Sequence, residues 1–490
     1  MSALSALARL EAVDARRAVP VATVRHCHLA DAPLVLIPLR LAGEAAAPLA
    51  VMLGTDRADP TLLAVPQPRN RDLRFAFAAE LAKVVLEHVE ASRGAAEELP
   101  PAKDGTERVR YAEAPQVIVP NPGGVAFLRL LGRSTRFRST EGPYAVEASV
   151  PALGRWATWF AERHDRPGSS LLLAATEALR LHWATGQSAL EDGNLAALLG
   201  WIDPPDGLDG PAAAARAEDP VRCPPAGPAT DPTFDNEVLA PAVAAYDATD
   251  GDPRAEERVR AALAGQLTPT WDLVWHAVDL LRALPEGASV PRRWERDRDA
   301  FTLFHQTFAE GVPQARRDTA VAAARRLHAL ERAQDAYDAQ RAFDDPMVMA
   351  EHRLNGQAFG GVVTEADPTR LDESGKRPKL RPRVRVATED PVRLDAGTPV
   401  CSAERPALKG RIVEYGTGGV LVELTGGLGR KLVPEPGTVP APGDRVCFTA
   451  LTDASFGPAR FPEREDTPWT HGGPPAEYVP AETDAAEEWS

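Results

Sequence analysis

A run of basic residues leads into one predicted strand, and these side chains are of the type that binds phosphate. Within residues 380–387 every second residue is apolar or proline, so the arginines between them share the opposite face of the strand. Alternate side chains on one face lie about 6.6 Å apart, which is compatible with contacts along a nucleic-acid backbone. The alternative is an ordinary solvated strand face, because charges on an edge strand prevent unwanted pairing. The predicted phosphate-binding residues are Lys376, Arg377, Lys379, Arg381, Arg383 and Arg385.

A second basic cluster lies at the end of a predicted helix and continues into an extended segment. It contains Arg129, Arg133, Arg136 and Arg138. Only six of the 55 basic residues are lysines, a bias typical of a GC-rich bacterial genome. The number of arginines therefore does not by itself indicate phosphate recognition, and a solvated helix face is the competing interpretation of this cluster.

Two histidines have the spacing of neighbouring metal ligands. His26 and His28 lie on the same face of a predicted strand, and Asp31 follows closely. Imidazole and carboxylate groups are ligands that zinc accepts, but no later His/Cys cluster supplies the rest of a site. We therefore predict two partly exposed sheet histidines, with neither a metal nor an organic cofactor. An enzyme site involving these three residues is kept as an alternative.

The common catalytic signatures are missing from the sequence. It has no GxxxxGK[ST] phosphate loop, no HExxH zinc motif, no GxSxG nucleophile elbow and no DxDxDG calcium loop. The glycine-rich segments 416–419 and 426–429 lie between predicted strands, where they are typical of turns and not of nucleotide binding. No catalytic residue is predicted.

Composition limits the class of protein. A chain of 490 residues exceeds one hydrophobic core, and a net charge of −15 excludes a generally basic nucleic-acid coat. The four cysteines form no CxxC pair, which favours a reducing compartment. The amino-terminal segment lacks the apolar region of a signal peptide, and no apolar run reaches the ~18 residues of a membrane span. We expect a cytoplasmic protein of several domains.

Periodicity predicts a multi-domain α+β chain. Its first half begins with an α/β domain, which a mostly helical domain follows. Residues 1–100 form a small α/β domain, a β-meander covered by a helix over Asp72–Glu90. Residues 101–201 are mostly helical, and the Pro/Gly/Ala-rich residues 202–235 form a mobile linker. The four strands of the meander are predicted at Val21–His28, Leu34–Leu41, Leu49–Leu53 and Leu62–Val65.

The second half begins with helices and then changes to a strand pattern. Residues 236–358 are helical and include a stalk-like helix over Gln314–Phe343, about 45 Å long, whose apolar seam needs a partner helix. Residues 359–452 form a small SH3/OB-like β-barrel, and residues 453–490 are a disordered acidic tail. The barrel strands are predicted at Gly361–Glu365, Leu380–Ala387, Pro399–Ser402, Gly410–Tyr415, Val420–Leu424 and Arg445–Ala450.

A long helix followed by a small barrel resembles the stalk-and-barrel accessory domain of superfamily 1 helicases. The resemblance covers residues 314–452, with the segment GRIVEYGTGGVLVEL and a PGD turn before the last strand. It implies association with nucleic acid or with a separate ATPase. The chain departs from helicases in lacking a phosphate loop, so no helicase catalytic residue can be assigned here. Residues 1–310 carry no resemblance.

These features favour a non-enzymatic, nucleic-acid-associated adaptor that binds DNA or RNA and works with a separately encoded helicase, ATPase or nuclease, without contact to a membrane. One alternative is a protein-interaction scaffold that presents the tryptophan-bearing helices around 156–201 and 271–294 to a partner, with the acidic tail as a tether. The other alternative is an enzyme with an unfamiliar site in the N-terminal α/β domain.

Overall fold

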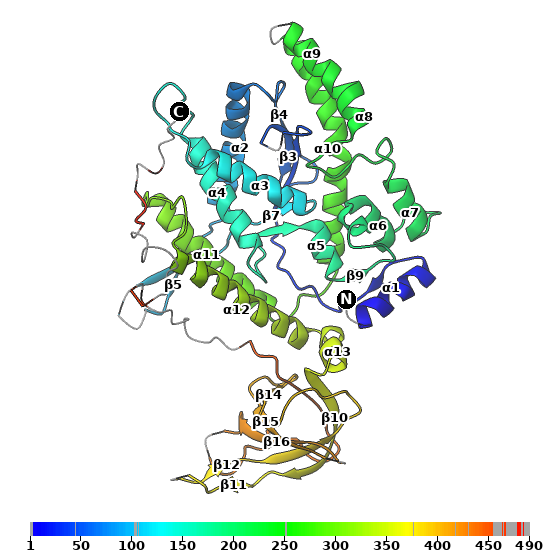
Figure 1. The fold of residues 1–490 in the computed structure, drawn as a ribbon, viewed down its shortest axis with the longest axis vertical. Helices are drawn as coiled ribbons and strands as arrows, with labels where there is room; N and C mark the ends of the chain where they lie inside the picture. Colours follow the sequence, from blue (N-terminus) through cyan, green and yellow to red (C-terminus); the bar gives the residue numbers. More distant parts are fainter. Residues whose placement is uncertain are drawn as a thin grey trace. The chain divides into compact units, whose positions relative to one another are not determined.

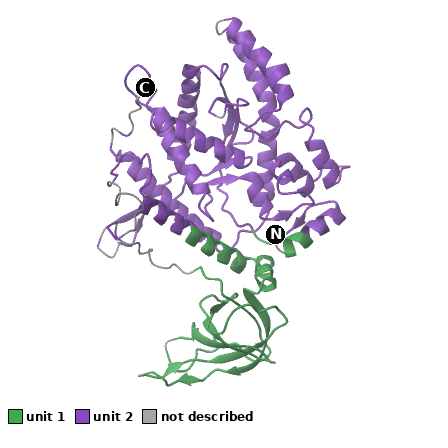
Figure 2. Ribbon diagram, in the orientation of Figure 1, with its two compact units in different colours: residues 1–7, 21–24, 331–458 green, residues 8–20, 25–330, 459–490 purple. Residues whose placement is uncertain are grey.

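The protein folds into two compact units in its computed structural model (Figures 1 and 2). Unit 1 comprises residues 1–7, 21–24 and 331–458, and unit 2 comprises residues 8–20, 25–330 and 459–490. The structure describes residues 3–44, 46–101, 105, 107–249, 252–375, 377–416, 418–429, 431–453, 463, 465–466, 478–481 and 484.

Unit 2 is built around a five-stranded mixed sheet in the order β4-β3-β2-β7-β8. The first three strands in this order pair antiparallel, as the predicted meander requires. Strands β7 and β8 then extend the sheet in parallel. The sequence predicts a strand at residues 116–119, where β7 lies, but neither β8 nor the parallel pairing. The strands are β2 (Leu34–Arg40), β3 (Pro48–Gly54), β4 (Thr61–Ala64), β7 (Val117–Val119) and β8 (Leu172–Ala174).

Helices cover both faces of this sheet. Along β2, Leu34 and Leu36 belong to one buried core while Val35 and Ile37 belong to the other, because successive side chains of a strand point to opposite faces. The first core contains α2 (Arg71–Ala91), α3 (Pro122–Thr135), α4 (Ser149–His164) and α11 (Val290–Ala309). The second contains α5 (Ala175–Arg180), α6 (Leu195–Ile202) and α10 (Pro253–Arg282).

Asparagine and aspartate caps set the start of several helices. The Asn70 side chain accepts hydrogen bonds from the backbone N–H groups of Asp72 and Leu73, so α2 begins just before the predicted Asp72. Asn121 caps α3 in the same way, and Pro122 occupies the first helical turn, where no backbone N–H is needed.

Two local predictions in unit 2 are wrong. Residues 21–28 do not form a strand. Val19–Pro20 (β1) pairs with β9 (Trp183–Ala184), Arg25 makes an isolated bridge to Glu286, and the N–H groups of His26 and His28 donate to side chains. Residues 150–201 are not helical throughout, because β8 interrupts them. This apolar run is buried on both faces, and periodicity alone does not separate such a strand from a buried helix.

Residues 202–235 are not a mobile linker. They include α7 (Gly210–Ala217) and α8 (Pro232–Phe234), and Phe234 is buried in the second core. The backbone between these helices bonds to the sheet region: Asn121 Nδ2 donates to the carbonyl of Gly227 at 2.9 Å. The segments predicted as separate domains, 1–100 and 101–201, therefore share one unit with most of 236–358. The π-helix η2 (Asp235–Leu239) and α9 (Ala240–Ala248) connect α8 to α10.

Six of the tryptophan side chains that the scaffold alternative would present to a partner are buried instead. Trp156, Trp159 and Trp201 are at most 5% exposed, as are Trp271, Trp275 and Trp294. The indole of Trp156 contacts other rings of α4 and α11, where an aromatic cluster fills the first core. These residues stabilise the fold and offer no surface to a partner.

The predicted stalk helix is α12 (Ala320–Asp344), and α13 (Pro346–Leu354) follows it. It is shorter than predicted, and its apolar seam is not covered: Ala320 and Ala323 are exposed, and Leu327 is 58% exposed. Between the two helices the fully buried Asp345 accepts hydrogen bonds from the backbone N–H groups of Met347 and Thr23. This carboxylate joins residues 21–24 to the rest of unit 1.

The C-terminal barrel is confirmed. Six strands close in the order β10-β13-β16-β15-β14-β17, around a core that includes Phe359 and Phe448. Gly419 in the predicted hairpin turn has φ +106°, and a Cβ there would meet the carbonyl oxygen of Val386 at 2.1 Å, so only glycine fits. The strands are β10 (Ala358–Asp367), β13 (Arg383–Ala387), β14 (Pro399–Ser402), β15 (Lys409–Gly416), β16 (Gly419–Gly426) and β17 (Arg445–Thr449).

A few short elements complete the described structure. None of its helices combines the length and the apolar character that crossing a bilayer demands. Most of the predicted acidic tail, 453–490, lies outside the described residues, but part of it contacts unit 2 and is discussed below. The remaining elements are α1 (Ala3–Ala15), β5 (Ala96–Leu99), β6 (Arg108–Tyr111), η1 (Glu191–Gly193), β11 (Leu371–Asp372) and β12 (Lys379–Leu380).

Candidate nucleic-acid interface

Strand β13 alternates as the sequence predicts. Leu380, Val384 and Val386 are buried in the barrel, with at most 7% exposure. The residues between them are partly exposed, so Arg381, Arg383 and Arg385 share the outer face. Strand β13 lies between β10 and β16 in the barrel, so it is not an edge strand. Its arginines are therefore not needed to prevent pairing with a strand of another molecule.

A buried carboxylate gathers the arginines of this face. Glu423 of β16 is 2% exposed and lies opposite Arg383 on one side and Arg411 of β15 on the other. Arg383 donates from Nε and Nη2 to Oε2 at 3.2 and 3.1 Å, and Arg411 donates from Nε and Nη2 to Oε1 at 3.1 and 2.7 Å. Arg370 adds a hydrogen bond to Oε2 at 2.8 Å. Three guanidinium groups therefore surround one carboxylate.

This surrounding charge keeps Glu423 ionised. Burial acts to raise the pKa of Glu423, but the hydrogen bonds from Arg411 and Arg383 outweigh it and hold the pKa below its ordinary value. One negative charge then faces three positive ones, so the cluster retains a net charge of about +2. We call Arg370, Arg383, Arg411 and Glu423 the arginine cluster.

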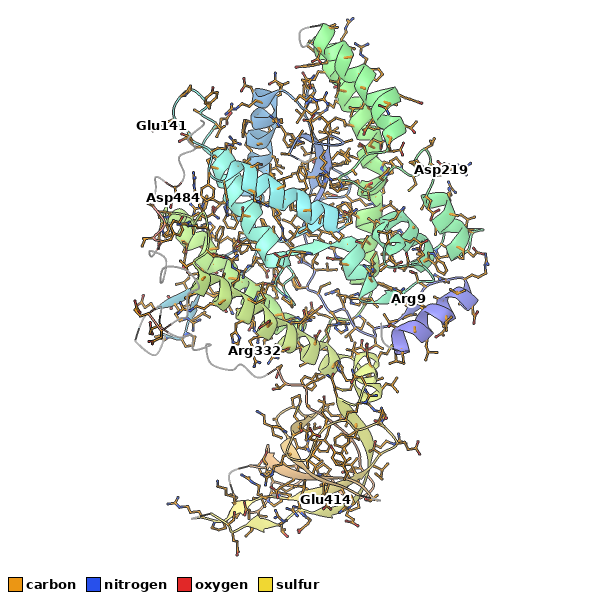
Figure 3. All side chains as sticks on the ribbon, in the orientation of Figure 1. Arg9, Glu141, Asp219, Arg332, Glu414 and Asp484 are labelled. Atoms are coloured by element: carbon orange, nitrogen blue, oxygen red, sulfur yellow. The ribbon has the colours of Figure 1, made fainter. Side chains whose placement is uncertain are left out.

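The other two arginines of the predicted row, Arg385 of β13 and Arg381 just before it, also contact groups of the protein itself. Arg385 lies between Glu365 and Glu414, with a nitrogen 3.2 Å from an oxygen of each carboxylate (Figure 3 labels Glu414). Arg381 donates to the carbonyl of Leu380 at 3.0 Å. Two arginines of the predicted row, Arg383 and Arg385, therefore face carboxylates of β10, β15 and β16.

The basic hairpin before β13 is more open. Strands β11 and β12 pair through Leu371 and Leu380, and the connection between them carries Arg377. Arg377 and Lys379 are exposed and make no ion pair within the described part of the chain, whereas Lys376 lies outside it. Arg370 Nη1 donates to the carbonyl of Arg381 at 3.1 Å, so the hairpin adjoins the arginine cluster.

The charge of the barrel differs from that of the whole chain. Residues 359–452 contain 14 basic and 12 acidic residues, a net charge of +2, while the complete chain carries −15. The remaining residues therefore account for −17. The arginine cluster therefore lies in a segment whose net charge is positive, although the chain as a whole is acidic.

The second predicted basic cluster does not converge on one point. Arg129 pairs with Asp165 at 2.7 Å, and Arg133 is exposed. The guanidinium of Arg138 lies over the ring of Phe75 at 5.3 Å, whereas that of Arg136 lies over Phe137 at 4.6 Å. Their neighbours are different, so these four residues are not one phosphate site.

The histidine hypothesis also changes. His26 is buried and lies 5.6 Å from His182, ring centroid to ring centroid, whereas His28 stacks on Trp294 with centroids 4.1 Å apart. They therefore do not share an exposed sheet face with Asp31. Among the described residues, no three His, Cys, Asp or Glu side chains are grouped as a metal site requires.

The imidazole of His28 has a second neighbour, Glu286, whose Oε1 lies 3.5 Å from Nδ1. Burial lowers the pKa of His28, against the opposing charge of this carboxylate. Nearby Cys27 is buried, which raises the pKa of its thiol to about 11 and makes it a poor nucleophile at neutral pH.

Sequence reasoning missed Arg370, Arg411 and Glu423. Glu423 had a visible signal, since it is a single acid between apolar residues in the segment VLVEL. Its arginine partners depend on the barrel order β13-β16-β15, which spacing along the chain does not reveal.

No protein-family model matches the chain, and comparisons with curated proteins and with solved structures found no similar protein. The resemblance to the helicase accessory domain therefore stays a prediction.

Proposed function

We propose that the C-terminal barrel binds the phosphate backbone of nucleic acid and that the protein is a non-enzymatic accessory subunit. The observation that carries the proposal is the arginine cluster, in which three guanidinium groups surround a single buried carboxylate. Guanidinium groups that are already oriented lose less conformational entropy when they bind phosphate.

The cluster retains donors for a ligand. Arg383 and Arg411 each direct Nε and Nη2 at Glu423, so Nη1 of each has no hydrogen-bond partner in the described part of the chain. Arg411 is 56% exposed and Arg383 33% exposed, which leaves both accessible to an anion. The exposed Arg377 and Lys379 would lengthen the contact along the backbone.

An accessory role also needs a surface for the separate ATPase or nuclease. The exposed apolar seam of α12 supports such a contact, because Leu327 is 58% exposed and Ala320 and Ala323 are exposed beside it. An apolar stripe on one helix is the usual way in which a helix docks against a partner.

The test is a binding titration with labelled single-stranded DNA, double-stranded DNA and single-stranded RNA at about 50 mM and 200 mM salt. The full-length protein should bind at low salt, and affinity should fall steeply at high salt. Arg383→Gln with Arg411→Gln should reduce affinity by at least about tenfold, which corresponds to about 1.4 kcal/mol.

The matched control is Arg69→Gln with Arg222→Gln, two exposed arginines of unit 2 that also pair with carboxylates. This control should bind like the wild type. A third variant, Arg377→Glu with Lys379→Glu, changes exposed side chains only and tests the hairpin even if the cluster variant folds poorly. Absence of binding at about 50 mM salt, or binding indifferent to both barrel variants, would overturn the proposal.

A further inference from the structure

The segment between α11 and α12 forms a basic surface together with the end of α3. Arg316 and Arg317 of this segment are both exposed. The guanidinium of Arg316 lies 5.2 Å from the ring centroid of Phe137, and that of Arg136 lies 4.6 Å from the same ring. Two cations thus share one aromatic ring at the surface of unit 2.

The described part of the C-terminal tail contacts this surface. The backbone N–H of Arg316 donates to the hydroxyl oxygen of Tyr478 at 2.9 Å, and Arg316 Nε donates to the carbonyl oxygen of Asp484. The guanidinium of Arg317 lies 5.2 Å from the ring centroid of Tyr478. Backbone, charge and aromatic contacts therefore hold the same short segment.

The tail segment is itself shaped for this contact. Tyr478 donates its hydroxyl hydrogen to Asp484 Oδ2 at 2.8 Å, and the N–H of Ala481 donates to the same oxygen at 3.0 Å. These two bonds converge on one carboxylate oxygen. Figure 3 labels Asp484 near α11. The tyrosine is thereby positioned to accept from Arg316 while its ring faces Arg317.

We infer that Arg136, Phe137, Arg316 and Arg317 form a docking site for an acidic, tyrosine-containing peptide, which the C-terminal segment of this chain occupies. We call these four residues the tail site. Residues 477–490 contain five acidic residues and no basic residue, so the charges of the two partners are complementary.

Attachment to the same chain explains how an exposed contact stays occupied. A tethered peptide has an effective concentration in the millimolar range, so an intrinsic dissociation constant well below that value keeps the site filled. A free peptide must then compete with the tail. The tail site is far in sequence from the arginine cluster and its inference does not depend on nucleic-acid binding.

The test uses full-length protein and a fluorescent peptide of residues 474–490. In the variant Tyr478→Ala with Asp484→Ala the protein's own tail is weakened as a competitor, so the added peptide should bind at least about tenfold more tightly than to the wild type. A peptide with the same two substitutions should bind weakly to both proteins.

Substitutions in the tail site should remove the increased peptide affinity of the tail variant. In the tail variant, adding Arg316→Glu with Arg317→Glu should abolish peptide binding, whereas adding Arg69→Gln with Arg222→Gln should preserve it. Unchanged tryptophan fluorescence would show that unit 2 stays folded, and Arg317→Gln alone, expected to weaken binding severalfold, serves if the double variant is unfolded.

Equal peptide binding by wild type and tail variant, or binding by neither at about 50 mM salt, would overturn the inference. The same variants are also titrated with labelled DNA. A tail variant that gains DNA binding through Arg316 and Arg317 but ignores the peptide would also overturn it, because the site would then recognise phosphate.

Discussion

Two buried carboxylates, one in each unit, are satisfied in opposite ways. Glu423 in the barrel is surrounded by three arginines, which hold its pKa below the ordinary value. Asp297 of α11 in unit 2 accepts a hydrogen bond from the N–H of Ser170 at 2.7 Å, and burial raises its pKa to about 6. Arg163 and Arg166 lower the pKa of Asp297 but do not offset the burial.

The two environments decide whether a buried carboxylate stays ionised. Neutral donors such as the Ser170 N–H satisfy the geometry of a buried carboxylate but do not replace its hydration, so the proton is held more tightly. Guanidinium groups do replace the hydration of the carboxylate, and the positive charge that the carboxylate does not neutralise remains at the surface. The Asp297 site therefore holds unit 2 together, whereas the Glu423 site also presents cations to an anion.

The largest effect is expected from Glu423→Gln. Removing the charge leaves three guanidinium groups around a neutral amide. Hydrogen bonds to a charged group contribute about 1.5–3 kcal/mol each, so weakening several of them should cost about 3 kcal/mol or more. All nine tryptophans lie outside residues 331–458, so tryptophan fluorescence reports on unit 2 alone. Hydrogen exchange of β15 and β16 is the suitable measurement, and unchanged protection there would contradict the role of Glu423.

The next effect is the pH dependence set by Asp297. Its pKa is about 6 in the folded protein and 3.8 ordinarily, so the folded protein binds this proton more tightly than the unfolded chain. Stability of unit 2 should therefore fall as the pH rises from about 4 to 6, by up to about 3 kcal/mol from this residue. Asp297→Asn should flatten this part of the profile of urea unfolding followed by tryptophan fluorescence.

Glu423 should give its unit a pH dependence of stability opposite to that of Asp297. Its folded pKa is lowered, so its contribution to stability is present above the ordinary pKa of 4.5 and is lost as the pH falls through the folded value. Exchange of β16 should increase in acid while unit 2 gains stability between about pH 6 and 4. Parallel pH profiles for both units would break the comparison.

A smaller effect is expected from a third buried carboxylate, Asp345, which accepts from the N–H groups of Thr23 and Met347. Asp345→Ala removes the cap of α13 and should cost about 1–2 kcal/mol. Increased exchange should be confined to residues 21–24 and α13, and Asp345→Asn should restore most of the loss because an amide oxygen can accept the same bonds.

The smallest effect is expected from Arg385→Gln. Arg385 pairs with Glu365 and Glu414, whose side chains are 73% and 56% exposed, and such pairs contribute about 0.5 kcal/mol or less. Hydrogen exchange of β13 should be nearly unchanged. A loss of stability as large as that of Glu423→Gln would show that burial does not explain the difference between the ion pairs of Arg385 and those of Glu423.

The barrel was predictable because its signals are local. Glycine-rich turns separate its short strands, and β13 alternates between buried and partly exposed residues along its whole length. The arginine cluster was predictable only in part, since Arg383 follows from alternation along one strand while Arg370 and Arg411 reach Glu423 across strands.

The failures in unit 2 share a physical cause. Strand β8 is buried on both faces and shows no period of two, and residues 202–235 pack through small side chains and backbone hydrogen bonds that leave no apolar stripe. The tryptophans were taken for a surface because a helix reveals its apolar side but not what covers it. His26 was misplaced because its neighbour His182 is 156 residues away.

The bond between Thr23 and Asp345 has a consequence for synthesis on the ribosome. Its donor and acceptor are 322 residues apart, so at the ~5–20 residues per second of translation the donor is made about 15 to 60 seconds before its acceptor. During that interval residues 21–24 lack the hydrogen bond to Asp345, although the flanking residues can already fold with unit 2. Residues 21–24 thus depend on a part of unit 1 that is synthesised much later, and a nascent chain stalled before residue 345 would leave the Thr23 N–H without this acceptor.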